Sequence, residues 1–118
     1  MKKAIRIEHE DGYGMFSHSG KDYSKNTLEE LCPEAWGRHA DLPTPRSLGY
    51  AISPYEFCAY ESMGEMVKWL KPGEIGILLE SGYRVLELHL EKFVEMGGQA
   101  FYFKESILEE IDISDLFR

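Results

Sequence analysis

The sequence predicts an α+β fold: a single domain over residues 1–118, with a mostly antiparallel, twisted sheet of four to six strands and two to four short helices packed on it. Residues 3–9 and 83–90 alternate in polarity with the period of two that is typical of strands. Residues 62–70 repeat apolar side chains every three to four positions, which is typical of a helix. A chain of 118 residues with 43% hydrophobic composition is long enough to bury one core.

The N-terminal segment is expected to form the first strand. From Lys3 to His9, one face carries Ile5 and Ile7, and the opposite face carries Ala4, Arg6 and Glu8. Residues 11–14 have the composition of a turn, so the short apolar piece at 15–16 could pair back with this strand as a hairpin.

A first helical region is expected after the polar residues 17–26. Thr27 and Glu30 form a capping box ahead of Leu28 and Leu31, and Pro33 can begin a further turn. Residues 37–54 then form a long connection containing three prolines, and ordered connections of this length tend to carry function.

The central unit, residues 55–90, predicts strand, helix, short helix and strand. Ser62 and Glu65 form a second capping box, and the apolar face of the helix behind it comprises Met63, Met66, Val67 and Leu70. The helix should end at 71–73, where Pro72 interrupts the backbone hydrogen bonds. A short helix is expected at 74–81, with Gly82 just beyond its C-terminus.

The C-terminal third is expected to complete the sheet. In the strand at 83–90, one face should be core and carry Leu86, Leu88 and Leu90, while the face with Glu87 and His89 should be at least partly wet. A tight reversal at 97–98 leads to a partner strand at 99–104. Residues 107–111 have helical spacing, and the expected docking residues of the C-terminus are Ile113, Leu116 and Phe117.

The charge is acidic and uneven. The net charge is −8, and residues 60–118 carry 12 Asp or Glu against 6 Lys or Arg. Such a chain repels phosphate backbones, so direct binding of nucleic acid is not expected, whereas a protein partner with a basic surface would suit it. No apolar run has the roughly 18 residues that span a membrane. We therefore expect a cytoplasmic protein with two reduced cysteines and no membrane contact.

Histidines are the first candidates for chemistry. His18 and His39 lie in expected loops, where they could bind a ligand. A zinc site built from these two histidines with Cys32 and Cys58 is conceivable, but the spacing matches no metal motif, so we predict no metal site.

Arg6 is the second candidate. A strand arginine facing a cleft can grip a phosphate or a carboxylate. The structural alternative, which we favour, is an ion pair with a glutamate of a neighbouring strand such as Glu87. Glu61 and Glu65 beside Ser62 are better explained by capping than by catalysis, and Tyr60 could line a pocket.

Several short motifs make the chain resemble small uncharacterised proteins of bacteriophages and prophages. They are Ile5-Arg6-Ile7-Glu8 with Gly12-x-Gly14-Met-Phe, His39-x-Asp41-x-Pro43, Phe57-x-x-Tyr60-x-Ser62 leading into Met66-x-x-Trp69-Leu70, and Gly82-Tyr83-x-Val85 followed by Gly98-Gln99-Ala100-Phe101.

The same order is faintly similar to the ADP-ribosyltransferase fold. That resemblance implies that Arg6 holds the pyrophosphate of NAD and that Tyr60 and Ser62 line the nicotinamide-ribose pocket. The family's Q-x-E motif would fall on Gln99-Ala100-Phe101, so Phe101 stands where the family has its catalytic glutamate. This departure counts against ordinary transferase activity.

These observations favour a small acidic phage-type accessory protein that acts by binding a macromolecular partner, such as a host or defence protein, rather than by catalysis, and that uses no cofactor. One alternative is an NAD-dependent ADP-ribosyltransferase-like or nucleotide-cleaving enzyme, with Arg6, Tyr60 and Ser62 as its candidate catalytic residues. The second alternative is a small-molecule sensing or sequestering protein, with its pocket in the loops around His18 and His39.

Overall fold

The computed structural model describes residues 1–12, 14–15, 27–42, 47–49, 51 and 55–118. Six strands form one sheet: β1 (Lys2–His9), β2 (Glu56–Tyr60), β3 (Tyr83–Leu90), β4 (Val94–Met96), β5 (Gln99–Phe103) and β6 (Ile107–Asp112). The described residues also form four α-helices, α1 (Leu28–Leu31), α2 (Pro33–Arg38), α3 (Met63–Trp69) and α4 (Pro72–Glu80). Short 3₁₀ turns occupy His39–Asp41, Lys104–Ser106 and Ser114–Phe117. The predicted α+β class is confirmed.

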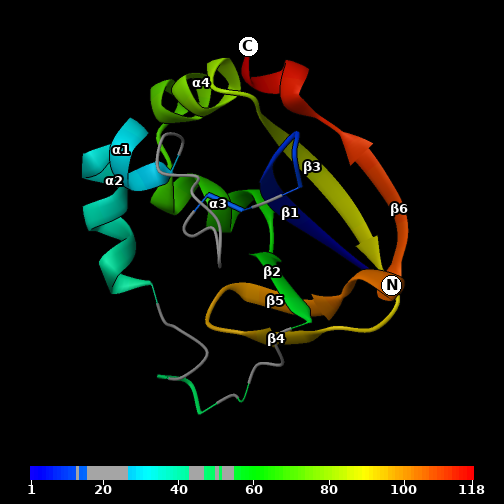
Figure 1. The fold of residues 1–118 in the computed structure, drawn as a ribbon. Helices are drawn as coiled ribbons and strands as arrows, with labels where there is room; N and C mark the ends of the chain where they lie inside the picture. The colour runs from blue at the N-terminus through cyan, green and yellow to red at the C-terminus, as the bar shows by residue number, and fades with distance from the viewer. Residues whose placement is uncertain (13, 16–26, 43–46, 50, 52–54) are drawn as a thin grey trace.

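The sheet has the order β4-β5-β2-β1-β3-β6, and its paired strands are antiparallel (Figure 1). The central strand β1 pairs with β3 along its whole length, from Lys2 opposite Leu90 to His9 opposite Tyr83. With β2 it pairs at only one register position, Ile5 opposite Tyr60. Figure 1 shows β3 and β6 running obliquely to β4 and β5. The sheet is therefore strongly twisted, and its two halves separate between β1 and β2.

The helices lie on one side of the sheet and cover its first core (Figure 1). Met66 and Leu70 are fully buried there against Ile5 and Ile7 of β1, as the period of the helix predicts. Val67, which we assigned to the same apolar face, is 49% exposed. Met66 is the buried residue of α3, and Val67, the next residue along the helix, points about 100° away from it.

The predicted leucine core of β3 is confirmed, and on the other face Glu87 and His89 are partly exposed as expected, although Tyr83 and Val85 on that face are buried. Alternation in β3 is as predicted, but Tyr83 and Val85 contribute to the core under the helices while the leucine face forms a second core. That second core comprises Leu86, Leu88 and Leu90 with Ala4, Ala59, Ala100 and Tyr102. Side chains of β2 and β5 thus share this second core with side chains of β1 and β3. Glu87 and His89 are half-buried.

The helix expected at residues 107–111 is wrong: this segment is strand β6. It pairs with β3, Glu87 opposite Ile111 and Leu88 opposite Glu110, and so supplies hydrogen bonds to an edge that would otherwise be open. The expected docking of the C-terminus is confirmed for Ile113 and Phe117, which pack against the first core, and wrong for Leu116, which is 72% exposed.

The predicted caps and turns are present. The side chains of Thr27 and Ser62 accept hydrogen bonds from the amides of Glu30 and Glu65. Gly82 has φ +92°, and a Cβ at this position would lie 2.7 Å from the Nε2 atom of His9, so both conformation and space require glycine. In the first turn, Glu8 forms a bridge with Gly14, but Phe16 of the expected hairpin lies outside the described residues.

Met66→Ala should lower the free energy of unfolding by about 2–5 kcal/mol, because it leaves a cavity under α3. Val67→Ala removes an exposed side chain of the same helix and should change it by less than about 1 kcal/mol. Urea denaturation followed by circular dichroism measures both values. Equal losses in the two variants would contradict the orientation of α3.

Candidate functional site

A cavity of about 350 Å³ lies where β1 and β2 separate. Arg6 of β1 and Tyr60 of β2, two of the predicted site residues, both line it. The remaining lining residues are Ile5, Ile7, Gly14, Met15, Leu42, Glu56, Phe57, Cys58, Ala59 and Gln99. The cavity thus lies beside the shortest strand pairing of the sheet, that of β1 with β2.

Arg6 spans the gap between the two strands. Its Nε donates to Glu8 Oε1 at 2.9 Å, and its Nη1 donates to the carbonyl oxygen of Cys58 at 2.8 Å. The guanidinium carbon also lies 5.3 Å from the centre of the Phe57 ring, within cation–π range. The expected ion pair is therefore present, but with Glu8 instead of Glu87. Glu8 follows Arg6 by two residues on the same face of β1, whereas Glu87 lies on the other face and contacts His89 at 3.0 Å.

The third nitrogen of Arg6 faces Gly14. A Cβ built on Gly14 would lie 3.4 Å from Arg6 Nη2, so the absence of a side chain leaves room beside the guanidinium. Within the described part of the chain, Nη2 makes no hydrogen bond, although the Arg6 side chain is only 10% exposed.

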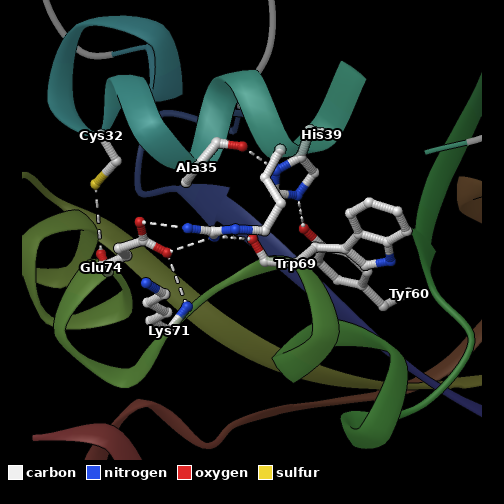
Figure 2. A network of polar contacts seen from close by, with 8 residues as sticks. Cys32, Ala35, His39, Tyr60, Trp69, Lys71 and Glu74 are labelled. Carbon is white, nitrogen blue, oxygen red and sulfur yellow. Dashed lines mark hydrogen bonds and ion pairs between the residues drawn. The ribbon is translucent and has the colours of Figure 1, made fainter. Parts of the chain in front are cut away.

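Behind the cavity, Tyr60 contacts His39, the other candidate that the structure describes. Figure 2 shows the His39 ring between α2 and β2, with Nδ1 2.7 Å from the Ala35 carbonyl oxygen and Nε2 2.8 Å from the Tyr60 hydroxyl. A carbonyl oxygen only accepts, so Nδ1 carries the hydrogen and Nε2 accepts from Tyr60 in the neutral ring. The Trp69 ring lies 5.8 Å from the imidazole, centre to centre.

The charge states of this pair follow from its burial. Burial lowers the pKa of His39; the Ala35 hydrogen bond opposes this effect, and the nearby Arg38 cation adds to it. Burial raises the pKa of Tyr60. Both side chains are therefore neutral at neutral pH, and His39 holds α2 against β2.

An ion pair that the sequence analysis missed fixes the helix that carries His39. Arg38 Nη1 donates to Glu74 Oε1 at 2.8 Å and to the carbonyl oxygen of Trp69 at 2.8 Å. The same Glu74 oxygen accepts from the amide of Lys71 at 2.8 Å (Figure 2). The hydrogen bond from Arg38 lowers the pKa of Glu74. Because Arg38 and Glu74 are 36 residues apart, no local pattern indicates this contact.

Of the other predicted site residues, one that the structure describes does not join the cavity. Ser62 caps α3 and does not line it, and His18 lies outside the described residues. Gln99 lines it, from the position on β5 opposite Tyr60. Phe101 is 1% exposed and supplies no carboxylate. The nucleotide-cleaving alternative stays a prediction.

A second candidate is a surface that we call the acidic edge, residues 108–112 of β6. Its exposed side chains are Leu108, Glu109, Glu110, Ile111 and Asp112. Hydrogen bonds from the side chain and backbone of Ser114 lower the pKa of Asp112, which keeps that carboxylate charged. Two exposed aliphatic side chains thus lie among three carboxylates on an outer strand of the sheet (Figure 1).

Comparison of this chain with protein-family models, curated proteins and solved structures gives no match. Among the described residues, no group of three or more His, Cys, Asp and Glu side chains could hold a metal ion. None of the described helices is long and apolar enough to cross a membrane.

His39→Gln should make stability less dependent on pH. In the wild type, unfolded His39 gains a proton below about pH 6.5, whereas the buried ring resists it, so the unfolding free energy falls as the pH drops. Urea denaturation between about pH 7.5 and 5.5 should show this slope in the wild type, at most about 1.4 kcal/mol per pH unit for one proton. The slope should be shallower in His39→Gln.

Tyr60→Phe is the matched control. It leaves the imidazole buried but removes the hydrogen bond to Nε2, so the free energy of unfolding should fall by about 1–3 kcal/mol at every pH with the slope retained. Identical slopes in the wild type and His39→Gln would show that His39 is not held neutral by the fold.

Proposed function

We propose that this chain is a small acidic accessory protein of the phage type that acts by binding a protein partner and not by catalysis. The acidic edge carries the interaction, and the partner presents a basic, extended segment. The proposal rests on one observation: an outer strand that leaves backbone groups open and surrounds them with carboxylates and aliphatic side chains.

The open backbone groups follow from the pairing of β6 with β3. The amide of Ile113 donates to the carbonyl oxygen of Val85 at 2.9 Å, and the register places Glu110 opposite Leu88. Hydrogen-bonded and non-hydrogen-bonded pairs alternate in an antiparallel ladder, so the N–H and C=O groups of Glu110 and Asp112 point away from β3. An incoming strand can use them, which is β-strand addition.

The side chains around these groups select the partner. Carboxylates at 109, 110 and 112 repel an acidic strand, including the same edge of a second copy of this chain, and attract lysine or arginine. Leu108 is 57% exposed and Ile111 is 37% exposed, so apolar side chains of the partner gain burial between its charges. Charged side chains commonly protect sheet edges from pairing with other chains. Exposed aliphatic side chains give no such protection, so their presence here favours a binding surface.

The hydrogen bonds of Arg6 in the cavity are consistent with a structural role for this side chain. Two of the three guanidinium nitrogens of Arg6 have partners in the fold: Nε donates to Glu8 on β1 itself, and Nη1 donates to the Cys58 carbonyl oxygen and so joins β1 to β2.

A fluorescein-labelled peptide of alternating lysine and valine should bind the protein in fluorescence anisotropy, and the affinity should fall as salt is raised because the contacts are exposed ion pairs. A peptide of alternating glutamate and valine is the control and should not bind. Failure of the basic peptide to bind, or equal binding of both peptides, would overturn the proposal.

Two variants locate the interaction. Glu110→Pro removes an outward N–H without removing a hydrogen bond to β3, so it should weaken binding about tenfold or more while the protein stays folded in circular dichroism. Glu110→Lys should also weaken binding, whereas Glu34→Lys, the same charge change on α2, should have a much smaller effect. Equal effects of the two lysine variants would indicate attraction by net charge and not by the acidic edge.

A further inference from the structure

We infer that the cavity between β1 and β2 binds a small organic carboxylate with an apolar body, held at its charged end by Arg6. This site is separate from the acidic edge and does not depend on the proposed function.

The first argument is the state of Arg6. The side chain is 10% exposed, its Nε and Nη1 donate to Glu8 and Cys58, and Nη2 has no hydrogen-bond partner among the described residues. Nη2 is not fully buried, and a guanidinium N–H that meets an anionic acceptor forms a strong, charge-assisted hydrogen bond. Nη2 borders the cavity at Gly14, where no side chain fills the space, so an acceptor atom of a ligand can reach it.

The second argument is the balance of charge. Glu8 serves two cations: Arg6 Nε lies 2.9 Å from its Oε1, and Arg84 Nη2 lies 3.6 Å from its Oε2. Arg84 also interacts with Asp112, so the positive charge that can attract a monoanion in the cavity is that of Arg6, which shares its counter-ion Glu8 with Arg84. Glu56 also lines the cavity and opposes a second negative charge on the ligand, so the site favours a carboxylate over a phosphate dianion.

The third argument is the shape and polarity of the walls. A cavity of about 350 Å³ is in the size range of small-molecule sites. Its apolar lining is Ile5, Ile7, Met15, Leu42 and Phe57, which can pack against a hydrocarbon body. At the Tyr60 end, the hydroxyl donates its hydrogen to His39, so its oxygen can only accept and repels a carboxylate. The anionic end of the ligand is thereby directed to Arg6.

The test compares phenylacetate with phenylacetamide, a neutral molecule of nearly the same shape, by isothermal titration calorimetry on the full chain. Phenylacetate should bind at least about tenfold more tightly, which corresponds to about 1.4 kcal/mol. Inorganic phosphate and NAD serve as competitors. Equal affinities for acid and amide, no binding of the acid at millimolar concentration, or tighter binding of phosphate or NAD would each overturn the inference.

Gly14→Ala provides a variant that keeps Arg6 in place. The added methyl group meets Nη2 at 3.4 Å and occupies the space where the carboxylate would bind, so the affinity for phenylacetate should fall about fivefold or more. Gly37→Ala adds a methyl group with nothing within 4 Å and should leave the affinity unchanged. Thermal melting of both variants verifies folding. Unchanged affinity in folded Gly14→Ala would show that the ligand does not contact Arg6 Nη2.

Discussion

The bond from Arg6 to the carbonyl oxygen of Cys58 is the contact on which the rest of the structure depends. The β1–β2 ladder has one register position, so the two halves of the sheet are held together there by few backbone hydrogen bonds. The guanidinium supplies one across the gap, at 2.8 Å. Its charge is costly to bury without compensation, and Glu8 on the same strand supplies the compensation at 2.9 Å. The Arg6 side chain thus adds a hydrogen bond between the two halves of the sheet and also lines the cavity.

The helices depend on two further polar contacts around this junction. His39 links the Ala35 carbonyl on α2 to the Tyr60 hydroxyl on β2, and Arg38 links α2 to Glu74 on α4. A helix of six residues has little stability of its own. The position of α2 is therefore set by these hydrogen bonds and by the burial of Ala35. The position of α2 in turn fixes His39 behind Tyr60.

Local sequence patterns are sufficient to predict the elements that depend on interactions within a few residues. The caps at Thr27 and Ser62, the turn at Gly82 and the alternation of β3 each arise within a few residues, and each was predicted. Strand β6 was not, because the spacing of Ile107 and Ile111 suits a short helix as well as a strand, and the open edge of β3 decides between them. The burial of Tyr83 and Val85 on the other face of β3 likewise depends on the packing of the whole first core.

In the candidate site, too, some features follow from local sequence and others depend on the whole fold. Arg6 and Tyr60 were predicted as site residues from their types and positions, and the structure brings them to one cavity. The contact of Tyr60 with His39 joins residues 21 apart through the packing of α2, and the partner of Arg6 depends on which face of β1 each glutamate occupies. Neither of these two contacts can be predicted from the spacing of the residues in the sequence.

The place of β1 in the sheet also determines the order in which the protein can assemble. Strand β1 lies inside the sheet, and its main partner is β3, with Lys2 opposite Leu90. Until residues 83–90 have been synthesised, Ile5 and Ile7 have no complete sheet to join. Closing such a long loop before the contacts form is entropically costly, so we expect folding to be slow compared with that of proteins with local contacts, with β1 exposed to aggregation or to chaperones in the meantime.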